Sequence, residues 1–132
     1  MRKFTFSQVE KLRRPADFDR AYSEGKKVPS SSLVLFFCPS RQGGTRLGVS
    51  VSKKIGNAVV RNRVKRRLRE TFRLNKHGLK KGYDLLLVAR AGIQEMKFRE
   101  VEAIALELFR RGGLISPEDE GTSEQGSPLQ TA

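Results

Sequence analysis

The chain is organised around one stretch, RLGVSVSKKIGNAVVRNRVKRRLRETFR, which runs from Arg46 to Arg73. Its beginning, residues 46–52, alternates between apolar and small or polar residues, a pattern typical of a strand with one buried face. From about Ala58 the period changes, and apolar residues recur along one stripe at about 100° per residue. That stripe comprises Val60, Val64, Leu68 and Phe72. The stretch therefore predicts a strand, a glycine-containing turn and an amphipathic helix in succession.

The rest of the predicted helix surface is cationic. Between Lys53 and Arg73 the chain carries nine cations and a single acid, Glu70. Charges of one sign gain almost nothing from pairing at i,i+4, so helicity alone explains them poorly. A phosphate backbone would neutralise them. The composition of this helix therefore indicates a nucleic-acid partner rather than a solvated face.

The start of the helix adds a second feature that suits phosphate. Asn57 is predicted to be the N-cap, and Gly56 frees the backbone before it. The unpaired amides of the first turn would then point outward beside Lys53 and Lys54. This arrangement predicts a phosphate-binding site at the start of the helix.

At this point the sequence resembles a known family. The run GVSVSKKIGNAVVRNRVKRRLRE closely resembles the signature of the bacterial ribonuclease P protein component, with Arg61, Asn62 and Arg63 as its RNR element. The likeness extends from about residue 12 to residue 111. It implies an α/β (α+β) two-layer sandwich, in which a small mixed sheet packs with helices. It also implies a left-handed βαβ crossover, although the general rule favours the right hand.

The resemblance also implies a function. Members of this family are protein subunits of ribonuclease P, which bind the catalytic RNA and the 5′ leader of precursor tRNA and promote removal of that leader. The RNA subunit holds the catalytic Mg²⁺ ions, so no catalytic or metal-binding residue is expected in this chain. The expected partners are ribonuclease P RNA and precursor tRNA. The residues expected to bind RNA are Lys53, Lys54, Asn57, Arg61, Asn62, Arg63, Lys65, Arg66, Arg69 and Arg73.

Aromatic residues outside the central stretch form a second candidate site. Pro15 opens a short predicted helix that Gly25 closes, and Phe18 and Tyr22 share one of its faces. From the residues alone, this pair is expected to face the core. The family resemblance instead implies that both line a cleft for the single-stranded leader, together with Phe36. Family members often carry a basic residue where this chain has serines at 30–32, so one cation of that cleft is in question.

Periodicity assigns the remaining segments. We expect a loop over 26–32, strands over 33–38 and 83–90, a turn over 39–44 and a helix over 96–111. The strand 33–38 is apolar on both faces, which predicts cover on both or a ligand on one. In the strand 46–52, Gly48, Ser50 and Ser52 form a face of small residues. That face would admit either a base or a helix.

Composition sets the broad class. The chain has 132 residues, a net charge of +13 and a pI near 10.6, which favour a single basic domain with a polyanionic partner. We expect this RNA-binding domain to span residues 1–115, followed by an acidic, disordered tail over 116–132. The sequence has no apolar run long enough to span a membrane and no signal-peptide pattern, which favours the cytoplasm. Cys38 is expected to be a buried free thiol and His77 a surface residue.

Two other functions compete with the family reading. A structural RNA-binding protein of the ribosome would share the charge and size, and would place Phe18 and Tyr22 in its core. A free-standing nuclease would need clustered carboxylates or a positioned acid and base. Outside the tail the chain has only scattered acids and one histidine, which disfavours catalysis by the protein itself.

Overall fold

The computed structural model describes residues 11–12, 14–41 and 43–115. The tail predicted over 116–132 lies outside the described residues. Two short 3-10 helices, η2 (Lys76–Gly78) and η3 (Ile93–Glu95), lie within these ranges. The main elements are α1 (Pro15–Glu24), β1 (Lys26–Pro29), β2 (Leu33–Pro39), β3 (Arg46–Ser50), α2 (Ala58–Asn75), β4 (Tyr83–Ala89) and α3 (Phe98–Arg111).

The strands form one mixed sheet in the order β1-β2-β4-β3. β2 lies antiparallel to both β1 and β4, whereas β3 runs parallel to β4. Because α2 connects β3 to β4, the predicted βαβ unit is confirmed. The left hand of its crossover stays a prediction.

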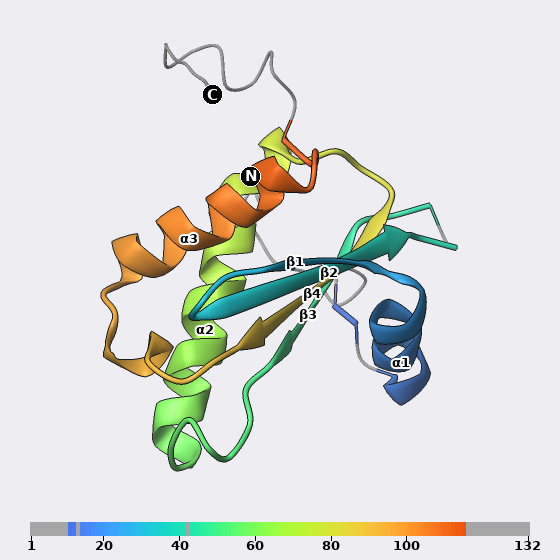
Figure 1. The fold of residues 1–132 in the computed structure, drawn as a ribbon. Coiled ribbons are helices and arrows are strands. Elements are labelled where there is room, and N and C mark those ends of the chain that lie inside the picture. The colour runs from blue at the N-terminus through green and yellow to red at the C-terminus, as the bar shows by residue number, and fades with distance from the viewer. Residues whose placement is uncertain (1–10, 13, 42, 116–132) are drawn as a thin grey trace, which may run out of the picture.

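Helices lie on both faces of the sheet (Figure 1). α2 and α3 cover one face, and α1 crosses the other. The main core lies under α2 and α3, where alternate residues of β2, β3 and β4 point toward them. The predicted small mixed sheet with packed helices is confirmed, and α1 adds partial cover to the second face.

The long helices follow from their apolar stripes and their caps. In α2, Val64, Leu68 and Phe72 are almost completely buried. In α3, the carboxylate of Glu100 accepts a hydrogen bond from the Lys97 amide at 2.8 Å, which satisfies a free donor of the first turn. α3 ends at Arg111 with Gly112 as its C-cap, and Gly113 has a φ of 77°, a conformation that favours glycine.

The loop predicted over 26–32 is wrong in its first half. Lys26–Pro29 forms β1, a short edge strand paired with β2. Only Val28 of this strand is buried, so its residues show little of the alternation that identifies a strand. β1 forms because the turn returns the chain beside β2, with the Ser30 amide donating to the Leu33 carbonyl at 2.9 Å.

The strand predicted over 33–38 is apolar on both faces, and the structure shows what covers the face of β2 that points away from α2. Val34 and Cys38 on this face are buried, whereas Phe36 is half-buried. α1 contacts β2 and β4 on this side. The second apolar face is therefore covered by a helix of the same chain, and this cover leaves Phe36 partly exposed.

Candidate nucleic-acid interface

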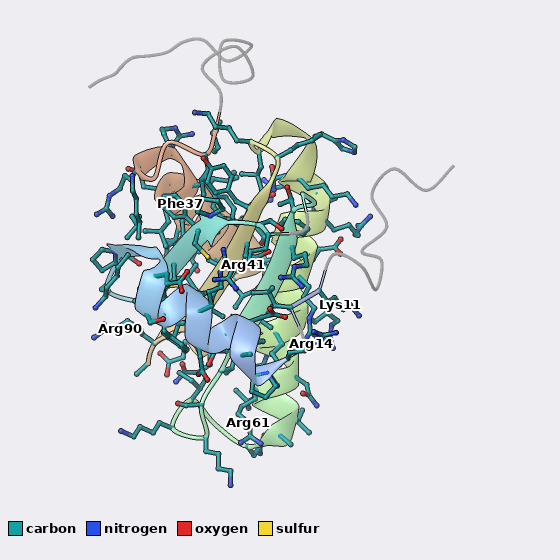
Figure 2. All side chains as sticks on the ribbon, turned by 90° about the vertical axis from the view of Figure 1, so that its right-hand side faces the viewer. Lys11, Arg14, Phe37, Arg41, Arg61 and Arg90 are labelled. Atoms are coloured by element: carbon teal, nitrogen blue, oxygen red, sulfur yellow. The ribbon has the colours of Figure 1, made fainter. Side chains whose placement is uncertain are left out.

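The start of α2 is held by hydrogen bonds to the preceding loop. The side-chain oxygen of Asn57 accepts from the Val60 amide at 3.0 Å, which confirms the predicted N-cap. The guanidinium of Arg61, which lies near the start of α2 in Figure 2, donates to the Gly56 carbonyl at 2.9 Å. Asn57 and Arg61 thus fix the loop that carries Lys53, and any contact they make to RNA uses their remaining donors.

One set of predicted RNA-binding residues is free to meet a partner. Within the described residues, they make no hydrogen bond or ion pair through their side chains, and all but the half-buried Lys65 are exposed. We call this set the basic face. It consists of Lys53, Lys54, Asn62, Lys65, Arg66 and Arg69. Five unpaired cations with one amide suit a phosphate backbone.

Other arginines of α2 are engaged within the protein. Arg63 donates to the Gln94 carbonyl at 3.4 Å and Arg67 to the Met96 carbonyl, so both lie against the segment around η3. At 100° per residue Arg63 and Arg67 lie beside the apolar stripe, which is the sequence signal for this inward placement. Arg63 was expected to bind RNA, and the structure sets its guanidinium apart from the basic face.

Arg73, another residue expected to bind RNA, lies in an ion pair. Its Nε donates to a carboxylate oxygen of Glu70 at 2.9 Å. This hydrogen bond holds the pKa of Glu70 below its ordinary value and raises the pKa of Arg73. Because Glu70 already neutralises it, Arg73 offers less charge to RNA than Arg66 or Arg69.

The three aromatic residues expected at the leader lie on the α1 side of the sheet. The rings of Tyr22 and Phe36 meet edge to face, with centroids 4.9 Å apart. Phe18 lies one turn before Tyr22 on α1, and its ring lies against Gly48 of β3. Gly48 and Phe36 occupy the same cross-strand row, through Leu86 of β4. We call Phe18, Tyr22 and Phe36 the aromatic strip.

The three residues of the aromatic strip are less buried than core aromatics such as Phe72 and Phe109. Tyr22 is 44% exposed, although it is a large aromatic residue, and Phe18 and Phe36 are half-buried. A core pair, as expected for a structural ribosomal protein, would be buried. The exposed part of Tyr22 leaves the aromatic strip partly open to solvent.

The surroundings of Gly48 show whether the face of small residues on β3 admits a base or a helix. A Cβ at this position would lie 3.0 Å from the Phe18 ring and 3.1 Å from Leu12. The small residue therefore admits a side chain of α1 rather than a base at this point. Ser50 is half-buried and Ser52 is exposed.

Replacing Gly48 with valine is expected to lower the free energy of unfolding by about 1 to 3 kcal/mol, because the added methyl groups overpack the contact with Phe18. Urea unfolding measures this change. Gly44→Ala is the matched control, since a Cβ there meets no atom within 4 Å. Equal stability of Gly48→Val and the wild type would contradict the close packing of α1 on β3.

Two residues considered for reactivity have ordinary environments. Cys38 is a buried free thiol, as predicted, and burial raises its pKa. His77 is exposed in η2.

Among the described residues, no three or more His, Cys, Asp or Glu side chains are grouped to hold a metal ion. No helix in the described ranges is long and apolar enough to cross a membrane.

The fold and these surfaces define a class, that of a small basic α+β protein with a cationic helix beside a mixed sheet. The family model described as Ribonuclease P matches residues 6–112. The ribonuclease P protein component of Clostridium botulinum (strain Langeland) is 41% identical over 107 residues, which cover 80% of this chain and 96% of the relative. The chain belongs to the family of bacterial ribonuclease P protein components.

Solved structures agree with this assignment. The ribonuclease P protein of Staphylococcus aureus superposes with a TM-score of 0.75 at 30% identity, covering 81% of this chain and 98% of the other. The protein from Thermotoga maritima gives a TM-score of 0.71 at 34% identity, with coverages of 77% and 96%. A ribonuclease P protein component is part of an endoribonuclease complex, and membership of the family implies an RNA partner.

Proposed function

We propose that this chain is the protein subunit of ribonuclease P, binding the catalytic RNA and the 5′ leader of precursor tRNA to promote endonucleolytic removal of the leader. The product of that reaction is the mature 5′ end of tRNA. The observation that carries the proposal is the basic face, whose five cations have no partner in the described part of a chain of this family.

The basic face is proposed to hold ribonuclease P RNA. It gathers charges from the loop before α2 and from the outer side of α2, on the helix that also packs into the core through Val64, Leu68 and Phe72. A rigid helix presents phosphate-binding groups at fixed spacing, and it loses little conformational entropy on binding. Contacts of this kind set position and affinity without reading sequence.

The aromatic strip is proposed to hold the leader. An unpaired strand can stack its bases on Tyr22 and Phe36, whereas a base-paired end cannot. Holding the precursor through its leader fixes the scissile bond relative to the RNA subunit, and such positioning lowers the reaction barrier. The proposal assigns the chemistry and the Mg²⁺ ions to the RNA subunit and places the complex in the cytoplasm.

The carboxylates of the described chain support that division of labour. Asp84, the most buried acid, already accepts hydrogen bonds from two arginines. Glu70 and Glu107 are paired with arginines of their own helices. These acids are committed to structural contacts, which supports a protein that binds and positions while its RNA partner reacts.

Leader dependence of binding tests the proposal. The complex of this chain with a bacterial ribonuclease P RNA is expected to bind precursor tRNA more tightly than mature tRNA, by roughly 1 to 3 kcal/mol for each stacked base. Titrations with leaders from one to eight nucleotides, at constant salt, measure this difference. Affinity that does not change with leader length would contradict the assignment of the aromatic strip.

A further inference from the structure

Helix α1 presents two different flanks on either side of one contact with the sheet. Ala21 is fully buried at that contact. At about 100° per residue, Phe18 and Tyr22 lie roughly 60 to 100° to one side of Ala21. Asp17 and Arg20 lie roughly 40 to 100° to the other side. One flank therefore carries residues of the aromatic strip, and the other carries charges.

The charged flank of α1 forms hydrogen bonds with a carboxylate of the sheet. Asp84 of β4 is fully buried. It accepts one hydrogen bond from Arg20 of α1 at 3.1 Å and two from Arg46 of β3 at 3.0 and 2.9 Å. Arg46 also reaches Asp17 of α1 at 3.4 Å, and Arg20 donates to the Pro39 carbonyl. We call Asp17, Arg20, Arg46 and Asp84 the clamp.

The charged flank of α1 borders a cavity lined mostly by polar side chains. This cavity of about 500 Å³ opens beside the clamp, and its lining includes Arg20, Arg46 and Glu24. Arg14 and Arg41, which also line it, lie beside α1 in Figure 2. Among the described residues that line this cavity, only Ala16 is apolar, so the directional hydrogen bonds of the clamp hold the charged flank.

A rotation of α1 about its own axis would strain the hydrogen bonds of the clamp. The apolar packing of Ala21, and of Phe18 against Gly48, is less directional than a set of hydrogen bonds, so it restrains rotation of α1 about its axis less tightly. A turn of about 20° would move a ring about 5 Å from that axis by roughly 2 Å. The same turn would pull Arg20 away from Asp84 and leave a buried carboxylate short of partners, which is strongly unfavourable.

We propose that Asp84 is a positioning residue, which acts through Arg20 and Arg46 to fix the rotation of α1 and so the placement of Phe18 and Tyr22 for the leader. This inference rests on the proposed function, since it assumes that the aromatic strip receives a single strand. It assigns leader preference partly to a residue that does not touch RNA.

Asp84→Asn tests the clamp, because the amide keeps the shape but loses the charge and one acceptor. In complex with ribonuclease P RNA, the ratio of precursor to mature tRNA affinity is expected to fall about tenfold, since misplacement of about 1 Å has large effects on positioning. Affinity of the chain for ribonuclease P RNA, and its salt dependence, are expected to stay unchanged. A wild-type ratio in the folded variant would overturn the proposal.

A second variant separates positioning from stability. Replacing Asp84 with leucine and both Arg20 and Arg46 with methionine removes three of the clamp's four charges and leaves Asp17, whose side chain is 20% exposed. Such replacements of buried ion pairs are often neutral or stabilising. This variant serves if Asp84→Asn fails to fold. It is expected to fold and still lose leader preference, because its contacts no longer fix the rotation. A full wild-type ratio would mean that the clamp serves stability alone.

Tyrosine fluorescence tests the clamp without RNA. The chain has two tyrosines and no tryptophan, so in a Tyr83→Phe background all tyrosine emission comes from Tyr22. Acrylamide quenching of Tyr22 is expected to change when Asp84→Asn is added, and unchanged quenching would overturn the clamp. If quenching changes but the complex of the wild-type chain shows no leader preference, the clamp stands and the proposed function fails.

Discussion

Replacing both Arg66 and Arg69 with alanine is expected to lower affinity for ribonuclease P RNA on the order of 100-fold, at about tenfold for each charge-assisted contact. Both side chains are exposed and unpaired among the described residues. Alanine favours helix, so α2 should persist. About five phosphate contacts predict a slope of log K against log salt of roughly 3.5 to 4.5 in magnitude, and losing two predicts a decrease of about 1.4 to 1.8.

The matched control removes the same charge from another helix. Arg99→Ala with Arg110→Ala takes the formal charge from +13 to +11, as the first pair does, but both residues lie on α3. Their loss should change the slope little, because the contacts to RNA are local. An equal decrease for both pairs would mean that net charge, rather than the basic face, governs binding.

Replacing Tyr22 with alanine is expected to weaken binding of precursor tRNA to the complex by roughly 5- to 150-fold, the equivalent of about 1 to 3 kcal/mol for one stacked base. Binding of mature tRNA should not change. Tyr22 is a sharper probe than Phe18, whose ring packs on Gly48. Phe18→Ala should also weaken leader binding, but with a loss of stability.

Leu74→Ala is the control for Tyr22→Ala. Leu74 is 39% exposed, close to the 44% of Tyr22, and it lies on α2 rather than α1. It should leave the ratio of precursor to mature affinity at the wild-type value. Equal losses for precursor and mature tRNA in Tyr22→Ala would remove Tyr22 from the leader site.

Much of the fold follows from local pattern. The change of period between β3 and α2, the cap at Asn57 and the apolar stripe of α3 all identify elements that the structure contains. β1 was missed because residues 26–29 bury one side chain, and their strand conformation depends on pairing with β2. Such pairing is a tertiary effect, which short edge strands do not show in their own sequence.

The candidate site, too, was predicted from the sequence only in part. The density of positive charge predicted the basic face, because cations on one helix cannot pair with each other and therefore indicate an anionic partner. The inward placement of Arg63 depends on η3, which lies about thirty positions along the chain. The clamp joins residues 38 and 64 positions apart. A lone acid within the apolar strand YDLLLVA was its only sequence signal, and no local pattern names the partners of Asp84.

Cleavage of precursor tRNA at low Mg²⁺ tests the central claim most directly. The assay compares this chain alone, a bacterial ribonuclease P RNA alone and the two together, with the Arg66→Ala, Arg69→Ala variant as a fourth arm. We expect 5′ leader removal only in the mixture with the wild-type chain, because neutralised phosphates and a held leader reduce the need for Mg²⁺. Cleavage by the protein alone, or no stimulation of a matched RNA, would contradict the account.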